Sequence, residues 1–130
     1  MEPQGKERRL KPRFNVRLPC TVALPEGERD ILFPDAALRC RTRDLSETGV
    51  GLVAPSIYLG YTCAVDEGRL LLVELELPAG PVRMLAAAAH YLRLDRAGEE
   101  ASYLIGLRIN EMGDAARALF NGYLASLAAG

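Results

Sequence analysis

Apolar and polar residues alternate with a period of two along most of the chain, which is typical of β-strands with one buried face. In residues 14–24 every second position is apolar, namely Phe14, Val16, Leu18, Cys20, Val22 and Leu24. Pro19 lies inside this run and indicates a sheet edge or a bulge, because proline has no backbone N–H to donate. The run predicts a first strand that lies at a sheet edge or carries a bulge at Pro19.

Further strand-like runs cover residues 38–45, 50–54, 70–77 and 82–94, and a last run places Tyr103, Ile105, Leu107 and Ile109 on one face. Segments rich in proline and glycine separate several of these runs, and residues 31–33 are a candidate for a short extra strand ended by Pro34. Several short strands at this spacing predict an all-β domain, either a small antiparallel barrel or a sandwich.

The C-terminal segment has a helical period instead. Its apolar stripe consists of Leu119, Phe120, Tyr123, Leu124 and Leu127. Asp114 precedes the stripe and is a candidate N-cap. Gly122 within the helix costs about 1 kcal/mol relative to alanine. We therefore expect this helix to depend on packing against the β-domain.

Composition and charge indicate one globular domain with a local anionic partner. The chain has 130 residues, 49% of them hydrophobic and 25% charged, and a net charge of −1. Residues 1–17 hold six basic and two acidic residues, a net charge of +4, so the remainder carries −5. We divide the chain into a mobile basic arm, residues 1–17, which leads into the first strand, and a barrel domain, residues 18–130.

Several classes of chemistry are not expected from this sequence. Cys20, Cys40 and Cys63 are odd in number and widely spaced, and His90 is the single histidine, so neither a disulfide framework nor a metal site is predicted. Free thiols fit a cytoplasmic location. Ser46 has no evident histidine base, so we predict neither catalysis nor a cofactor. The apolar runs are too short for membrane insertion, and no signal peptide is recognised.

Residues 49–54 match the GxGxxA spacing of dinucleotide-binding turns. That motif works only between a strand and a helix, because the helix N-terminus receives the pyrophosphate. Here the residues after Gly51 are strand-like and end at Pro55, so this interpretation is rejected.

Two short motifs carry the candidate chemistry. Arg9 and Arg13 lie four residues apart around Pro12, which disfavours helix, and four extended residues span about 13–14 Å at most. Both guanidinium groups could therefore reach one small anionic ligand, although a solvated basic terminus has the same sequence. Residues 44–49 combine aspartate, serine and glycine, which also suits an ordinary turn with a glycine at positive φ.

The two motifs together are more specific than either one alone. Arg9-x-x-x-Arg13 stands before the first strand, and Asp44-x-Ser46-x-x-Gly49 follows the second. With the flanking strands and the C-terminal helix, this order resembles the PilZ domain family over essentially the whole chain. The resemblance implies a six-stranded antiparallel β-barrel with a C-terminal α-helix. It also implies a bacterial cytoplasmic receptor that binds the second messenger cyclic di-GMP.

The family pattern implies a role for each motif residue. Arg9 and Arg13 would pair with guanine edges, contact phosphate or stack on a base. Asp44 would accept hydrogen bonds from the guanine N1–H and N2 amino group. Ser46 would contact phosphate or guanine, and Gly49 would let the backbone approach the ligand closely.

Two further points follow from the resemblance. Arg8, just before the first motif, implies two stacked ligand molecules. His90 or Tyr91 could serve as an aromatic stacking surface, although ordinary barrel positions explain both residues as well. Independently of the resemblance, Arg39, Arg41 and Arg43 could widen the positive field, but they are interpreted as the solvated face of a strand.

Ligand would order the arm and create a surface for a downstream protein that the sequence does not identify. The alternative is a PilZ-type protein-interaction adaptor that binds no nucleotide. Nucleic-acid binding is a weaker alternative, because the body of the protein is acidic and few aromatic residues are available to stack on bases.

Overall fold

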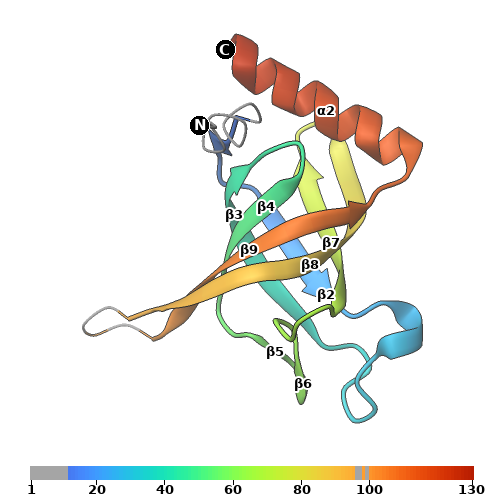
Figure 1. Cartoon of the computed structure of the whole chain (residues 1–130), viewed down its shortest axis with the longest axis vertical. Coiled ribbons are helices and arrows are strands. Elements are labelled where there is room, and N and C mark those ends of the chain that lie inside the picture. Colours follow the sequence, from blue (N-terminus) through green and yellow to red (C-terminus); the bar gives the residue numbers. More distant parts are fainter. Residues whose placement is uncertain (1–11, 96–97, 99) are drawn as a thin grey trace, which may run out of the picture.

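The computed structural model describes residues 12–95, 98 and 100–130 (Figure 1). The strands are β1 (Phe14–Asn15), β2 (Pro19–Ala23), β3 (Ala37–Leu45), β4 (Gly49–Ala54), β5 (Tyr58–Leu59), β6 (Thr62–Cys63), β7 (Leu70–Leu77), β8 (Gly80–Leu94) and β9 (Ser102–Glu111). The helices are the short 3₁₀ helix η1 (Glu26–Glu28) and α2 (Asp114–Ala129).

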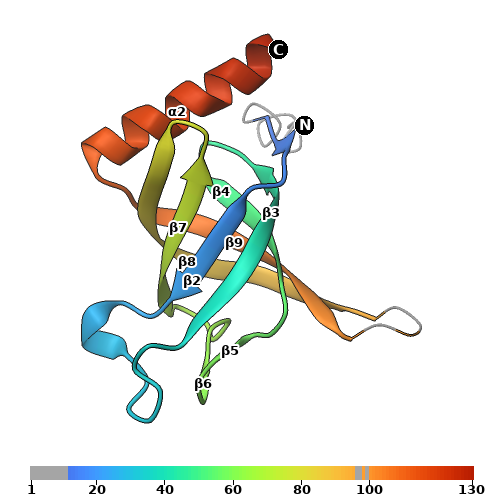
Figure 2. The ribbon, with the colours of Figure 1, turned by 180° about the vertical axis from the view of Figure 1, so that it is seen from behind.

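Six strands close into an antiparallel barrel, which confirms the predicted fold class. They pair in the order β3-β2-β7-β8-β9-β4, and β4 pairs back to β3. Closure leaves these strands without the unpaired edges that an open sheet would expose. The hairpin of β8 and β9 continues beyond the barrel wall (Figures 1 and 2).

The predicted alternation of strand residues is confirmed by their burial. The barrel interior is filled by the apolar faces of its strands, including Cys20, Val22, Cys40, Leu52, Leu71, Val73, Leu75, Val82, Ile105 and Leu107. Burying a leucine or valine completely contributes about 1.5–3 kcal/mol. All three cysteines are free thiols, and Cys20 and Cys40 face each other as cross-strand partners in the core.

The structure has neither the sheet edge nor the bulge predicted at Pro19: β2 pairs with both β3 and β7 without a register shift, and the predicted first strand is instead broken into β1 and β2. β1 and β2 both pair with β3, and residues 16–18 lie between them. The buried hydroxyl group of Thr42 bridges this break: it accepts a hydrogen bond from Leu18 N at 2.8 Å and donates one to Val16 O. Pro19 is the first residue of β2, a position where a missing N–H is tolerated.

Replacing Thr42 with valine should therefore destabilise the barrel. The side chain keeps its shape, but Leu18 N and Val16 O lose their shared partner, which costs about 1–3 kcal/mol when such groups are buried. Urea denaturation measures the change in the free energy of unfolding. Thr21→Val, the same substitution on the exposed face of β2, is the control and should change stability by less than about 0.5 kcal/mol. Equal effects of the two substitutions would contradict the bridging role.

One predicted strand is absent from the structure, and one short hairpin was not predicted. Residues 31–33 form no strand but a bend, and the Ile31 side chain is 94% exposed. The β5–β6 hairpin was not predicted, because two residues per strand are too few to show a period.

The C-terminal helix is confirmed, with a different cap and a narrower buried stripe. Gly113 is the N-cap and Asp114 is the first helical residue, so the predicted cap at Asp114 is wrong. Phe120 and Leu124 are buried, whereas Leu119 is 43% exposed and does not belong to the stripe. α2 lies over the end of the barrel where the described chain begins (Figures 1 and 2).

The described residues contain neither a helix suited to span a membrane nor a metal-binding group of side chains. No helix there has the length and apolar character needed to cross a bilayer. Within the same residues, no group of three or more His, Cys, Asp and Glu side chains is arranged to hold a metal ion.

Candidate functional site

A β-bulge in β3 sets the direction of the Asp44 side chain. The register between β3 and β4 shifts between Thr42 and Asp44, and Arg43 is the extra residue. Strict alternation from buried Thr42 would point Asp44 into the barrel, where an unpaired carboxylate is costly. The bulge instead leaves Asp44 on the outer face and returns Leu45 to the core, where it is fully buried.

The carboxylate of Asp44 lies over Gly51, its cross-strand neighbour in β4. A methyl group at position 51 would stand 2.5 Å from Asp44 Oδ1 and 3.1 Å from the carboxyl carbon. Any larger residue would therefore displace the carboxylate. The sequence did not assign a role to Gly51, although a glycine inside a strand signals the close approach of another group.

Arg13 reaches Asp44 from the N-terminal segment. Its Nη1 lies 3.7 Å from Asp44 Oδ1, and the side chains are 65% and 19% exposed. An ion pair this exposed contributes only about 0–1 kcal/mol to stability. The contact matters because it joins one residue from each of the two sequence motifs.

Ser46 and Gly49 shape the turn between β3 and β4. Ser46 is buried, and its Oγ accepts hydrogen bonds from Gly49 N at 3.1 Å and Thr48 N at 3.4 Å. Gly49 does not adopt a positive φ, so the conformational reason suggested by the sequence is wrong. A Cβ at position 49 would instead lie 3.0 Å from the carbonyl oxygen of Leu107, and this close packing favours glycine.

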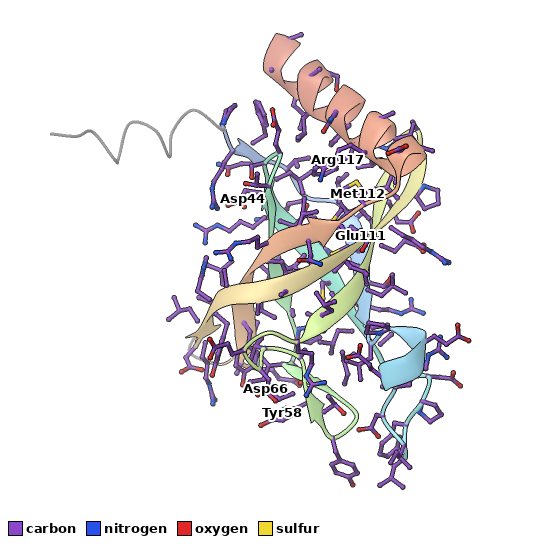
Figure 3. All side chains as sticks on the ribbon, turned by 45° about the vertical axis from the view of Figure 1, so that its right-hand side comes forward. Asp44, Tyr58, Asp66, Glu111, Met112 and Arg117 are labelled. Carbon is purple, nitrogen blue, oxygen red and sulfur yellow. The ribbon has the colours of Figure 1, made fainter. Side chains whose placement is uncertain are left out.

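Helix α2 holds the same turn through Arg117. Arg117 Nη1 donates to the carbonyl oxygen of Glu47 at 2.9 Å. The guanidinium carbon lies 5.8 Å from the ring centre of buried Phe120, within the range of a cation–π contact. Arg117 and Asp44 are both at the helix end of the barrel (Figure 3). The shape of the turn therefore depends on α2, a contact between distant segments that the sequence did not predict.

An arginine-lined cavity of about 760 Å³ lies on the outer face beside this turn. Its lining consists of Asn15, Val16, Arg17, Arg41, Thr42, Arg43, Val53, Leu94, Ser102 and Leu104. The volume is typical of small-molecule sites. Three of the described lining residues are arginines and none is acidic, which favours an anionic ligand. Arg41 and Arg43 are exposed as predicted, but they belong to this cavity.

A row of four residues crosses the outer face close to the cavity. Asp44 pairs with Gly51, Gly51 with Gly106, and Gly106 with His90, on β3, β4, β9 and β8. A methyl group at position 106 would overlap the His90 imidazole. The Asp44 carboxylate thus lies over Gly51 and the His90 imidazole over Gly106, and the outer strands are about 14 Å apart along the sheet.

His90 and Tyr91 lie on opposite faces of β8, because neighbouring residues in a strand alternate. The His90 imidazole lies over Gly106. Tyr91 pairs with Ile105, whose side chain is buried in the barrel, and is itself 50% exposed. Of the two candidates for stacking, only His90 is on the face that carries Asp44.

The structure brings together four of the six predicted site residues, Arg13, Asp44, Ser46 and Gly49, at the β3–β4 turn. Arg8 and Arg9 lie outside the described residues. Most of the predicted arm, residues 1–17, lies outside them as well, and its last part contributes β1, which pairs with β3. The residues that the sequence did not assign to the site are Gly51, Gly106, Arg17, Arg41, Arg43 and Arg117.

Comparison with known proteins gives one family and one fold. The family model described as PilZ domain matches residues 7–126. A search of the curated proteins finds no match.

Three solved structures resemble the chain, each at 17% sequence identity. The PilZ domain of YcgR from Escherichia coli with c-di-GMP has a TM-score of 0.65 and covers 92% of this chain and 91% of that one. MrkH, a c-di-GMP-dependent transcription regulatory factor, has a TM-score of 0.65, with coverages of 92% and 51%. MotI/DgrA, the inhibitor of motility of Bacillus subtilis, has a TM-score of 0.58, with coverages of 97% and 56%. At this identity the likeness shows the fold alone.

Proposed function

Because the chain belongs to the PilZ domain family, we propose that it is a receptor for cyclic di-GMP. The ligand binds at the β3–β4 turn and on the adjoining outer face of the barrel. The observation that carries this proposal is the approach of Arg13 to Asp44, which joins the two motifs in space. Two structural neighbours whose names mention c-di-GMP, YcgR and MrkH, support it.

The chemistry of the site suits this ligand, which has two guanine bases and two phosphates. The ionised carboxylate of Asp44 accepts from the guanine N1–H and N2 amino group. The guanidinium of Arg13 pairs with the O6 and N7 edge of guanine or with a phosphate. Arg17, Arg41 and Arg43 in the cavity supply further positive charge for the phosphates.

The row formed by Asp44 and His90 suits a planar base. Gly51 and Gly106 let the carboxylate and the imidazole lie close to the sheet, and the exposed His90 ring offers a stacking surface. Base stacking contributes about 1–3 kcal/mol, and a bidentate base contact a similar amount. Micromolar binding needs about −8 kcal/mol, so the ligand requires several of these contacts together.

The N-terminal arm completes the site in this proposal. Arg9 and Arg8 precede Arg13 by four and five residues, and we place them over the ligand after it binds. Arg8 extends the site to a second, stacked ligand molecule. The ordered arm is the surface that a downstream protein recognises. The messenger is intracellular, so the proposal places the protein in the cytoplasm.

Isothermal titration with cyclic di-GMP tests the proposal. The parent protein should bind with a dissociation constant in the micromolar range or below, and Arg13→Ala should weaken binding about tenfold or more, as expected for the loss of a bidentate contact. Arg29→Ala removes another partly exposed, ion-paired arginine and should bind as the parent does. Absence of binding by a folded parent would refute the proposal.

Arg117→Ala should weaken cyclic di-GMP binding by about 3–10-fold, equivalent to one hydrogen bond. Loss of the bond to Glu47 O frees the turn that presents Asp44 and Ser46. The same variant should show faster amide hydrogen exchange at Gly49. Arg83→Ala removes an arginine that pairs with Glu74 on β7, and this control should change neither quantity. Unchanged affinity together with unchanged exchange would exclude the positioning role.

A nucleotide-independent adaptor is the second candidate function. The specific observation in its favour is an exposed cluster of apolar side chains at the other end of the barrel, and the name of one neighbour, MotI, describes an inhibitor of motility. If the titration shows no binding while the circular dichroism spectrum reports an intact β-domain, the adaptor function is the better account.

A further inference from the structure

A group of large apolar side chains is exposed at the end of the barrel opposite to α2. We call it the apolar knob, and it consists of Ile31, Leu32, Phe33, Tyr58 and Tyr61, which are 94%, 68%, 50%, 53% and 73% exposed. The rings of Phe33 and Tyr61 are 5.5 Å apart between centroids and tilted by 56°. Tyr58 lies at this lower end in Figure 3. Leu32, Phe33 and Tyr61 line one cleft, and exposed apolar side chains gathered in this way usually mark an interaction site.

Asp30 connects the two distant segments that form the apolar knob. Its Oδ1 accepts hydrogen bonds from Leu32 N at 3.0 Å and Phe33 N at 2.9 Å. Its Oδ2 accepts from Tyr61 N at 3.0 Å and Thr62 Oγ1 at 2.9 Å. The carboxylate thus ties the bend after η1 to the β5–β6 hairpin. These bonds satisfy backbone groups of the bend, while the apolar side chains of the bend point to solvent.

The hydrogen bonds to Asp30 favour its charged form. Burial by itself raises the pKa of Asp30, but the hydrogen bonds from Phe33, Thr62, Tyr61 and Leu32 outweigh it and lower the pKa below its ordinary value. These hydrogen bonds hold the two segments together before a partner binds, and a surface ordered before binding loses less entropy on association.

Gly60 shows how closely the two segments are fitted. Its φ is +64°, a conformation that side-chain-bearing residues rarely adopt. A Cβ at this position would also stand 2.8 Å from the carboxyl carbon of Asp30 and 3.0 Å from Phe33 Cβ. The turn of the hairpin is therefore shaped to receive the bend.

Beside the knob is a cleft of about 680 Å³, lined by Leu32, Phe33, Pro34, Asp35, Ala36, Gly60 and Tyr61. The surrounding charge is acidic. Residues 26–35 contain Glu26, Glu28, Asp30 and Asp35 but only one basic residue, Arg29, a net charge of −3. An apolar surface within an acidic rim is complementary to apolar anchors flanked by positive charge.

We propose that the apolar knob is a docking surface for a segment of a partner protein that carries apolar anchors flanked by lysine or arginine. The knob is separated from the β3–β4 turn by the length of β3, whose nine residues span about 26 Å over eight steps of strand. Docking is therefore independent of cyclic di-GMP, and the proposal does not rest on the proposed function.

A second copy of the chain fits the knob less well than a basic partner. Residues 18–130 carry −5, so two barrel domains repel each other.

Selection from a library of random 15-residue peptides on the full-length protein tests the proposal. Peptides that bind Ile31→Ser/Leu32→Ser are removed in each round, since these substitutions leave the backbone hydrogen bonds of the bend possible. We expect the enriched peptides to combine aromatic or aliphatic residues with a net positive charge. A synthetic enriched peptide should bind the double variant at least tenfold more weakly than the parent, with and without cyclic di-GMP. Leu92→Ser, which changes an exposed leucine on β8, should bind like the parent.

Three results would overturn the proposal. The first is a selection that enriches no peptide, or enriches acidic ones. The second is equal binding to the parent and to Ile31→Ser/Leu32→Ser by isothermal titration. The third is concentration-dependent association of the parent in sedimentation velocity that the double variant lacks, which would make a second copy the occupant. A thermal midpoint of the double variant near that of the parent shows that the comparison is made on folded protein.

Discussion

Asp44→Ala should reduce the affinity for cyclic di-GMP by about 10–100-fold, the largest effect expected of any single substitution. The carboxylate is the acceptor that recognises guanine donors, and a charge-assisted contact of this kind contributes about 1.5–3 kcal/mol. The bulge in β3 turns the Asp44 side chain to the outer face of the barrel. Isothermal titration against the parent measures the change.

Asp35→Ala is the matched control for Asp44→Ala. It removes the same charge from a side chain that is 97% exposed and contacts Arg29 at 3.8 Å, at the opposite end of the barrel. Its affinity for cyclic di-GMP should equal that of the parent within a factor of about two. If both aspartate variants lose affinity equally, the effect comes from net charge and the specific role of Asp44 is wrong.

Gly51→Ala should weaken cyclic di-GMP binding by a comparable factor, about tenfold or more, although it adds only one methyl group. That methyl would stand 2.5 Å from Asp44 Oδ1, so the carboxylate must leave its position over Gly51, where it lies beside Arg13. A contact that fixes a base loses about 1–3 kcal/mol when its geometry is broken. Titration gives the affinity, and urea denaturation separates it from any loss of stability.

The control for Gly51→Ala is Gly122→Ala on helix α2. No atom outside the helix backbone lies within 4 Å of a Cβ at position 122. This variant should bind as the parent does and gain up to about 1 kcal/mol of stability, because alanine is the better helix former. If Gly51→Ala binds cyclic di-GMP as the parent does, the ligand does not contact the Asp44 carboxylate in its position over Gly51.

The barrel could be predicted because its core depends on alternation that is local in the sequence. In β7, Leu71, Val73, Leu75 and Leu77 are all buried, and Glu74 and Glu76 lie on the other face. Such a period needs no knowledge of the neighbouring strands. The helix was equally evident from the spacing of Phe120, Tyr123 and Leu124.

Features that depend on contacts between distant residues could not be predicted. Thr42 bridges a strand break because its hydroxyl meets residues that precede it by more than twenty positions. Residues 31–33 have a strand-like composition, but the carboxylate of Asp30 satisfies backbone N–H groups that a strand would pair with a neighbour. Local propensity was overridden by a side chain in both places.

The candidate site could be predicted only in part, because some of its contacts also join residues that are distant in the sequence. Asp44, Ser46 and Gly49 are close in sequence, so their turn was recognisable. The row of Asp44, Gly51, Gly106 and His90 needs the cross-strand register of β3, β4, β9 and β8, and this register includes three shifts. The contact of Arg117 with Glu47 joins residues seventy positions apart. Neither follows from spacing along one strand.

The most direct test of the ligand site is a two-dimensional ¹H–¹⁵N NMR titration of the full-length protein with cyclic di-GMP. The largest amide shifts should occur at Arg13, Asp44, Gly49 and Gly51, while Ile31 and Tyr61 in the apolar knob stay unchanged. Shifts centred on the knob, or no shift at a ligand concentration that saturates a micromolar site, would contradict the assignment of this face of the barrel as the cyclic di-GMP receptor site.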